Sequence, residues 1–445
     1  MNDGGTVTEI SLLKRREIVD ALRRGTVPHH GLETFAVGLD RFVAILDEEL
    51  ADVATGGAGF KAIRGDYGTG KTFFARWLEH RARERGYATA LVQISETDTP
   101  LYRFETLYRR ALESLQTREW ATGAFRCLID RWFFDLEEEA APGIADDDLE
   151  GIARAVGELL ERRLASISAT QPLFAAALRA IHRARLAGDQ TIAEGLLAWL
   201  MGQPNVGADI KRTAGIKGDL DHRGASGFFR GLLAVLHQTG RSGLLLVLDE
   251  VETIQRVRAD SREKSLNALR QLVDDLDSRV YPGLYVVVTG TPQFFDGPQG
   301  IRRLPPLEQR LHTDFSGPER FDTGRGTQVR LGAFDDTKLL EVGRRVRALY
   351  PARHPERIAA RVTDDTLQRL ARGITGQLGG KTGVAPRVFL RKLVLDLLDK
   401  VDAHPDYDPA QHFNLVVSAG ELTAEERAAA GIAAPSVDDI HLELP

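Results

Sequence analysis

The chain has 445 residues, of which 43% are hydrophobic, and its net charge is −6. This length and composition fit two or three domains with buried cores. The net charge excludes a polycation that binds nucleic acid over its whole surface. The single cysteine, Cys127, excludes an internal disulfide and a thiolate metal site. No apolar run approaches the roughly 20 residues of a membrane helix and no signal peptide is recognisable, so we expect a soluble cytoplasmic protein without membrane contact.

Two helices are predicted before the first strand. Residues 9–24 carry apolar side chains on one face, and Gly25 marks the end of this helix. A linker with the sequence VPHHGLETFAVG leads to the second helix, which is predicted over residues 39–54. Residues 1–38 therefore form an N-terminal helical segment and linker in this interpretation.

A βαβ unit follows. Residues 60–65 have the composition of a buried strand, residues 72–86 that of a helix and residues 88–95 that of a second strand. The turn between the first strand and the helix reads GDYGTGKT, which has the spacing of a phosphate-binding P-loop. Because a strand precedes this loop and a helix follows it, a chance match to a glycine-rich turn is the weaker interpretation.

The loop predicts a site for a nucleoside triphosphate, which we take to be ATP. Its glycines allow backbone N–H groups to close around the β-phosphate, and the positive end of the following helix adds to the attraction. Lys71 is predicted to bridge the β- and γ-phosphates, and the Thr72 hydroxyl to ligate Mg²⁺. The predicted phosphate-binding residues are Gly65, Asp66, Tyr67, Gly68, Thr69, Gly70, Lys71 and Thr72.

The rest of the chain predicts an α/β fold. Residues from about 100 to 240 are almost wholly helical in pattern, and apolar strands are then predicted over 242–250, 284–291 and 327–334. Buried strands separated by helices favour a mostly parallel sheet that is covered on both faces. We therefore expect a parallel-sheet P-loop core with a large helical insertion, followed by a C-terminal helical lid domain.

These patterns also predict the domain boundaries. The core with its insertion is expected over residues 39–334, the helical lid over 335–400 and a tail over 401–445. The tail is rich in Pro, Asp and Ala, and its last residues, DIHLEL, have the pattern of a closing strand.

The strand over 242–250 ends in two acids that suit hydrolysis. Asp249 is predicted to hold Mg²⁺ through water, and Glu250 to polarise the attacking water as general base. Taken alone, the same residues also fit a buried strand followed by an acidic N-cap of the next helix. The P-loop earlier in the chain favours the catalytic interpretation.

Polar residues after the next strand are further candidates. Thr289, with Thr291 behind it, is predicted to lie between the acidic pair and the γ-phosphate, although threonines also simply end strands. Arg302, Arg303 and Arg310 are candidates for an arginine presented to the γ-phosphate of a neighbouring subunit, and we select Arg310 for a test. Solvated or salt-bridged arginines are the competing interpretation for each of them.

Arg387 begins a helix of the predicted lid. An arginine at this place can reach onto the phosphates and report the nucleotide state to the lid. An exposed arginine on an amphipathic helix is the alternative, and the residue types alone do not separate the two.

Taken in this order, the motifs resemble the AAA+ superfamily of P-loop ATPases. The segment FAVGLDRFVAILDEEL is similar to the box that precedes the P-loop in initiator-like and signalling (STAND) ATPases. The resemblance implies that the backbone of Val37 and Gly38 lies against the adenine. Leu39 replaces the usual arginine of that box and Asp40 stands for its acid, which leaves the backbone role in place.

A closer resemblance covers most of the chain. The opening RREIVDALRRGTVPHHGLETFAVG, the loop RGDYGTGKTF, the stretch SETDTPLYRFETLYRRALESL and GLLLVLDEVETI are together similar to the bacterial DUF2791 P-loop family. That family includes the ATP-binding component (BrxD type) of BREX phage-defence systems. The resemblance implies ATP and Mg²⁺ as cofactors, other defence proteins including a helicase as partners, and a homo-oligomer.

Three functions fit these features: a nucleotide-gated switch or remodeller in phage defence, an ATP-controlled DNA-binding initiator or loader that works with a helicase, and a scaffold that binds ATP without hydrolysis. The 45 residues after the predicted lid are too few for a complete winged-helix DNA reader, and Glu250 argues against a scaffold. The densest basic region lies at 344–372 and 387–392, and its arginines could face ATP, a neighbouring subunit or DNA.

Overall fold

The computed structural model describes residues 10–145, 147–377 and 385–417, and a five-stranded sheet forms its centre. All strands are parallel, in the order β2-β3-β4-β1-β5. The strands are β1 (Gly59–Arg64), β2 (Ala88–Gln93), β3 (Leu244–Asp249), β4 (Leu284–Gly290) and β5 (Gln328–Arg330). The first strand after the linker, β1, therefore lies between β4 and β5, so that the segment after β1 is flanked by the ends of two other strands.

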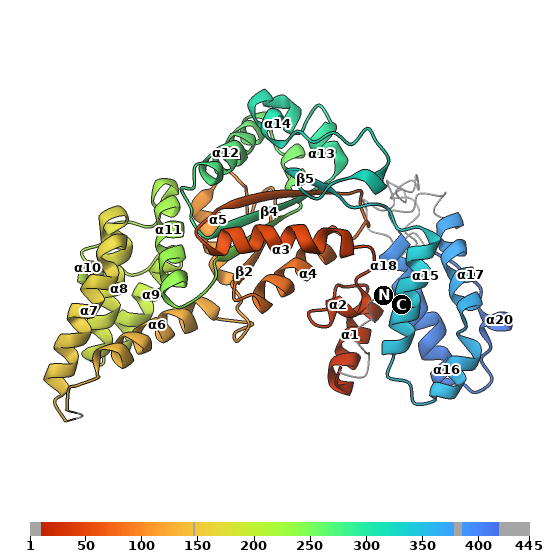
Figure 1. The fold of residues 1–445 in the computed structure, drawn as a ribbon, viewed down its shortest axis with the longest axis horizontal. Coiled ribbons are helices and arrows are strands. Elements are labelled where there is room, and N and C mark those ends of the chain that lie inside the picture. The colour runs from red at the N-terminus through yellow and green to blue at the C-terminus, as the bar shows by residue number, and fades with distance from the viewer. Residues whose placement is uncertain (1–9, 146, 378–384, 418–445) are drawn as a thin grey trace, which may run out of the picture.

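Helices cover both faces of this sheet and extend beyond both of its ends (Figure 1). The helices before β2 are α1 (Leu12–Arg24), α2 (Leu32–Phe35), α3 (Asp40–Ala54) and α4 (Lys71–Glu84). Between β2 and β3 lie α5 (Phe104–Glu113), α6 (Ala124–Ala140), α7 (Leu149–Thr170), α8 (Pro172–Leu186), α9 (Gln190–Leu200), α10 (Ala208–Thr213) and α11 (His222–Gln238). In Figure 1, α6 to α10 project away from the sheet as one arm.

The remaining helices follow β3. A short 3₁₀ helix (Val251–Gln255) and α12 (Ala259–Asp277) precede β4, and α13 (Pro292–Asp296) and α14 (Pro305–Leu311) precede β5. The C-terminal helices are α15 (Asp336–Leu349), α16 (Pro355–Arg361), α17 (Asp364–Gln377), α18 (Ala385–Lys392), α19 (Asp399–Ala403) and α20 (Pro409–His412), with a π-helical turn (Leu393–Leu398) between α18 and α19.

The alternation of side chains along the strands creates two hydrophobic cores. In β3, Leu244, Leu246 and Leu248 face the core that contains the inserted helices and α12, whereas Leu245 and Val247 face the core that contains α3, α4 and the C-terminal helices. Successive residues of a strand point to opposite faces, so a strand that is apolar at every position needs a cover on both sides. The continuous apolar run of β3 therefore follows from its central place.

The N-terminal helix α1 packs against the C-terminal helices. Arg15 of α1 donates to the carbonyl oxygens of Leu349 at 2.7 Å and of Ala348 at 2.9 Å, at the end of α15. Arg23 of α1 pairs with Asp399 of α19 at 2.8 Å. Cationic side chains at the end of a helix satisfy carbonyl groups that have no partner within the helix. These contacts join the beginning of the chain to the helices of its last third.

The expected α/β fold with a parallel sheet and a helical insertion is confirmed, and the bounds of several elements differ from those predicted. Strand β5 is only Gln328–Arg330, shorter than the predicted 327–334, because the chain leaves the sheet after Leu331 donates to the carbonyl of Arg64. The first helix begins at Leu12, whereas it was predicted to begin at residue 9. The predicted strand DIHLEL lies outside the residues that the structure describes.

Candidate nucleotide-binding site

The loop GDYGTGKT connects the carboxyl end of β1 to α4. Gly68 and Gly70 have φ angles of +79° and +92°, in the left-handed region where glycine is favoured. Gly65 has no room for a side chain, since a Cβ there would lie 2.4 Å from Thr69 Oγ1. The loop therefore folds tightly around its own backbone and presents the N-terminus of a 14-residue helix, α4, to the cavity beside it.

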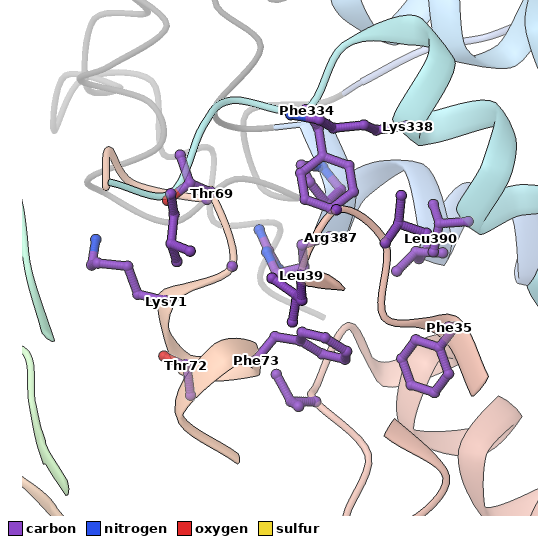
Figure 2. A pocket seen from close by; sticks show the side chains of 18 of the residues that line it. Phe35, Leu39, Thr69, Lys71, Thr72, Phe73, Phe334, Lys338, Arg387 and Leu390 are labelled. Carbon is purple, nitrogen blue, oxygen red and sulfur yellow. The ribbon is translucent and has the colours of Figure 1, made fainter. Parts of the chain in front are cut away.

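Lys71 is buried, and its amino group contacts the loop backbone. The Nζ atom donates to the carbonyl oxygens of Gly65 at 2.9 Å and of Asp66 at 3.3 Å. It also lies 3.7 Å from Oε1 of Glu252 and 5.0 Å from the centre of the Tyr67 ring. In Figure 2 the amino group points away from the apolar side chains on the other side of the loop. Lys71 thus lines the polar end of the cavity, beside the loop.

Asp249, at the end of β3, accepts hydrogen bonds from the hydroxyl groups of two predicted site residues. The Thr72 hydroxyl donates to Asp249 Oδ2 at 3.1 Å, and the hydroxyl of the fully buried Thr289 donates to Asp249 Oδ1. This meeting follows from the sheet order, because β4 lies between β1 and β3 and its last residues lie between the loop and the acid. The structure therefore brings Thr72, Asp249 and Thr289 together.

Glu250 adjoins this cluster in an unusual backbone conformation. Its φ of +61° is uncommon for a residue with a side chain, and its N–H donates to Thr289 Oγ1 at 3.1 Å. Its carboxylate accepts a hydrogen bond from Gln93 Nε2 at 2.9 Å. Gln93 is the last residue of β2 and is paired in register with Asp249. Non-glycine residues in this backbone region are concentrated at functional sites.

A cavity of about 420 Å³ lies between the loop and the C-terminal helices. Its wall beyond the loop is mostly apolar, and Val37 and Gly38 form part of it. Figure 2 shows aromatic and aliphatic side chains gathered on this side. They include Phe35, Leu39, Phe73, Phe334 and Leu390. An apolar slot next to a polar loop can take a planar base and the charged chain attached to it.

Two cations of the C-terminal helices line the same cavity. Arg387 comes from α18 and Lys338 from α15, and Figure 2 places the Arg387 side chain between the loop and Leu39. The predicted approach of Arg387 to the phosphate-binding loop is thus sterically available. Lys338 was not a candidate from the sequence.

The arginines that follow β4 lie elsewhere. Arg310 of α14 pairs with Asp274 of α12 and donates to the carbonyl of Pro306 at 3.0 Å. Arg302 is 55% exposed and lies 3.5 Å from Glu308. Neither of them lines the cavity, and neither does Arg303. Within a single chain, these arginines do not join the site that Thr72, Asp249 and Thr289 form.

The oxygen donors fit Mg²⁺ only together with phosphates. In the described parts of the chain, no group of three or more His, Cys, Asp or Glu side chains could hold a metal by itself. Thr72 and Asp249 nevertheless place a hydroxyl and a carboxylate at hydrogen-bond distance beside the loop. Mg²⁺ is commonly bound by one or two protein side chains plus substrate phosphates and water, which is what this pair offers.

Three residues of the site had not been singled out from the sequence. Gln93 holds Glu250, Glu252 faces Lys71 and Lys338 lines the cavity. The position of Gln93 at the end of a strand that pairs with β3 was a usable signal, because the carboxyl ends of parallel strands share one edge. Glu252 and Lys338 carried no comparable signal.

A second buried carboxyl group lies on α4, below the loop. Burial raises the pKa of Glu79 to about 7, against the opposing effect of Arg83. Between pH 4.5 and 7 the native state therefore binds more protons at Glu79 than the unfolded chain does, and this group makes folding less favourable as the pH rises. We expect Glu79→Gln to gain stability relative to wild type, by about 1–3 kcal/mol, between pH 5 and pH 8. Denaturant unfolding of both proteins at the two pH values measures this; an unchanged difference contradicts it.

Comparisons with known proteins identify the family of the chain. A family model described as BREX system ATP-binding protein BrxC/D matches residues 10–417. Searches of curated proteins and of solved structures gave no match. Among the residues that the structure describes, no helix is long and apolar enough to span a membrane. The family match covers the loop, the acids of β3 and the C-terminal helices described above.

Proposed function

The chain belongs to the family of BREX ATP-binding proteins BrxC/D, and on that premise we propose that it hydrolyses ATP with Mg²⁺ and acts as a nucleotide-gated switch or remodeller in phage defence. One observation supports hydrolysis most directly: Asp249 accepts hydrogen bonds from the hydroxyl groups of both Thr72 and Thr289, and Glu250 follows it in the chain. A site that only bound ATP would not require a half-buried acid such as Glu250 at this edge of the sheet.

The cavity suggests how ATP lies. The base fits the apolar wall that includes Phe35 and Phe334, with the backbone of Val37 and Gly38 beside it. The phosphates then reach the backbone N–H groups of the loop and the N-terminus of α4. Lys71 neutralises phosphate charge at the far end.

The residues around Asp249 divide the chemistry. Thr72 and Asp249 would hold Mg²⁺, which neutralises charge on the phosphates. Thr289 fixes the carboxylate of Asp249 and the backbone of Glu250 through its hydroxyl group. Glu250 orients and deprotonates the attacking water. The hydrogen bond from Gln93 occupies only one oxygen of its carboxylate, so the other oxygen can accept from that water.

The proposed switch depends on which parts of the chain line the cavity. Its walls come from the loop, from the linker before α3 and from the C-terminal helices that carry Lys338 and Arg387. Helix α1 is joined to α15 by Arg15 and to α19 by Arg23. ATP would bridge the sheet and this helical unit, and release of the cleaved phosphate would remove the charge that Arg387 can contact, so the two parts can change their relative position with the nucleotide state.

Arg310 provides a test of action across subunits. We expect Arg310→Ala to leave ATP binding unchanged and to lower turnover only in the assembled state, by roughly tenfold or more, since an arginine from a neighbour stabilises transition-state charge. Turnover measured over a concentration series, with the mass in solution, checks this. Asp274→Asn is the matched control, because it frees Arg310 from its ion pair without removing it. A variant that assembles and turns over normally removes Arg310 from the mechanism.

The alternative function is ATP-controlled DNA binding. The basic region of the C-terminal helices gives it limited support, because several of its arginines have acidic partners. Arg344 and Arg347 both pair with Asp364, and Arg345 pairs with Glu341. The ATPase rate with and without double-stranded DNA, measured alongside the mass in solution, separates the functions. We expect no stimulation by DNA alone, and strong stimulation would favour the DNA-binding alternative.

A further inference from the structure

Glu252 is a buried carboxylate at the phosphate end of the cavity that the proposed mechanism does not use. It lies in the 3₁₀ helix after β3, is 4% exposed and lines the cavity. Its Oε1 is 3.7 Å from Lys71 Nζ, and its Oε2 is buried without a hydrogen-bond partner. Burying a carboxylate is costly unless a cation compensates for it. Among the described residues, Lys71 is the only cation that forms an ion pair with Glu252.

The same lysine is required by the phosphates. Its amino group is now held by the carbonyl oxygens of Gly65 and Asp66 and by the charge of Glu252. A β- or γ-phosphate that takes Lys71 must replace these contacts and leave Glu252 without its cation. Removing one partner of a buried charge pair costs more than the pair itself contributes. The carboxylate therefore opposes phosphate binding at Lys71.

We propose that Glu252 is a positioning residue that holds Lys71 at the polar end of the cavity and competes with the β- and γ-phosphates for it. The proposal rests on the proposed function, since it assumes that ATP phosphates bind at Lys71. Its effect is a threshold: a ligand must bring enough negative charge to Lys71 to displace Glu252. ATP and ADP bring that charge, whereas AMP has no phosphate beyond the first.

The test is an equilibrium titration of wild type and Glu252→Gln with a fluorescent ATP analogue, and with ATP, ADP and AMP as competitors. EDTA is present throughout, so that Asp249 and Thr72 do not act through Mg²⁺. Glutamine keeps the shape of the side chain and removes only its charge. We expect Glu252→Gln to bind ATP and ADP about tenfold more tightly, and AMP with unchanged affinity. Glu252→Ala should change the affinities in the same direction.

Glu79→Gln is the matched control, since it neutralises another buried acid without touching Lys71, and its nucleotide affinities should equal those of wild type. Thermal melting confirms that each variant is folded. Unchanged or weaker ATP binding by the folded glutamine and alanine variants overturns the proposal, and so does an equal gain for AMP, which would mean a general loosening of the pocket. Failure of wild type to bind ATP would instead reject the proposed function itself.

Discussion

Lys71→Ala should weaken ATP binding by about two orders of magnitude, because it removes the buried cation at the phosphate end of the cavity. The loop backbone remains, but its N–H groups alone do not neutralise a triphosphate. The variant also leaves Glu252 without its partner, and this unpaired carboxylate further disfavours phosphate binding. Titration with a fluorescent ATP analogue measures the loss directly.

A charge-matched control separates this effect from the loss of any lysine. Lys264 of α12 is exposed and lines a different groove, between α12 and α5. Lys264→Ala should bind ATP as wild type does. If Lys71→Ala also bound ATP with wild-type affinity, the assignment of GDYGTGKT as the phosphate-binding loop would be wrong.

Glu250→Gln should retain ATP binding and slow hydrolysis by roughly 10²–10⁴-fold, the range typical of a lost general base. The amide has nearly the shape of the acid but cannot accept the proton of the attacking water. The hydrogen bond between Thr72 and Asp249 does not involve the Glu250 carboxylate, so Mg²⁺ binding should persist. Phosphate release in a single turnover, compared with ATP affinity, separates the two effects.

Glu263 provides the corresponding control for an acid. It is an exposed residue on α12, next to Lys264 in the chain, and lines the same separate groove. Glu263→Gln should hydrolyse ATP at the wild-type rate. Retained turnover in Glu250→Gln would assign the base to another residue, and Glu252 would be the next candidate because it lines the same cavity.

The strands and the loop could be predicted because local patterns determine them. Buried parallel strands need apolar residues at nearly every position, and β3 and β4 are buried along their whole length. The loop could also be predicted from its local sequence, since the left-handed backbone at positions 68 and 70 favours glycine. The order of the strands could not be predicted from local sequence patterns, and this order brings Thr289 to Asp249.

The remaining parts of the site depend on contacts between distant segments. Glu252 looked like one more acid after the strand, and only the fold turns it into a buried partner of Lys71. The sequence did not decide whether Arg387 approaches the loop or is an exposed arginine. The packing of α18 beside α1 puts the Arg387 side chain in the cavity wall. Arg310 shows the reverse case, because its ion pair with Asp274 lies away from the cavity.

Binding and hydrolysis of ATP in this cavity can be examined in a structure determined with Mg²⁺ and a non-hydrolysable ATP analogue. We expect the base against the apolar wall near Phe35 and Phe334, the phosphates on the loop, and Mg²⁺ beside Thr72 and Asp249. We also expect Lys71 to have moved from Glu252 to the phosphates. A nucleotide bound outside this cavity, or phosphates bound there without Lys71, would contradict these expectations.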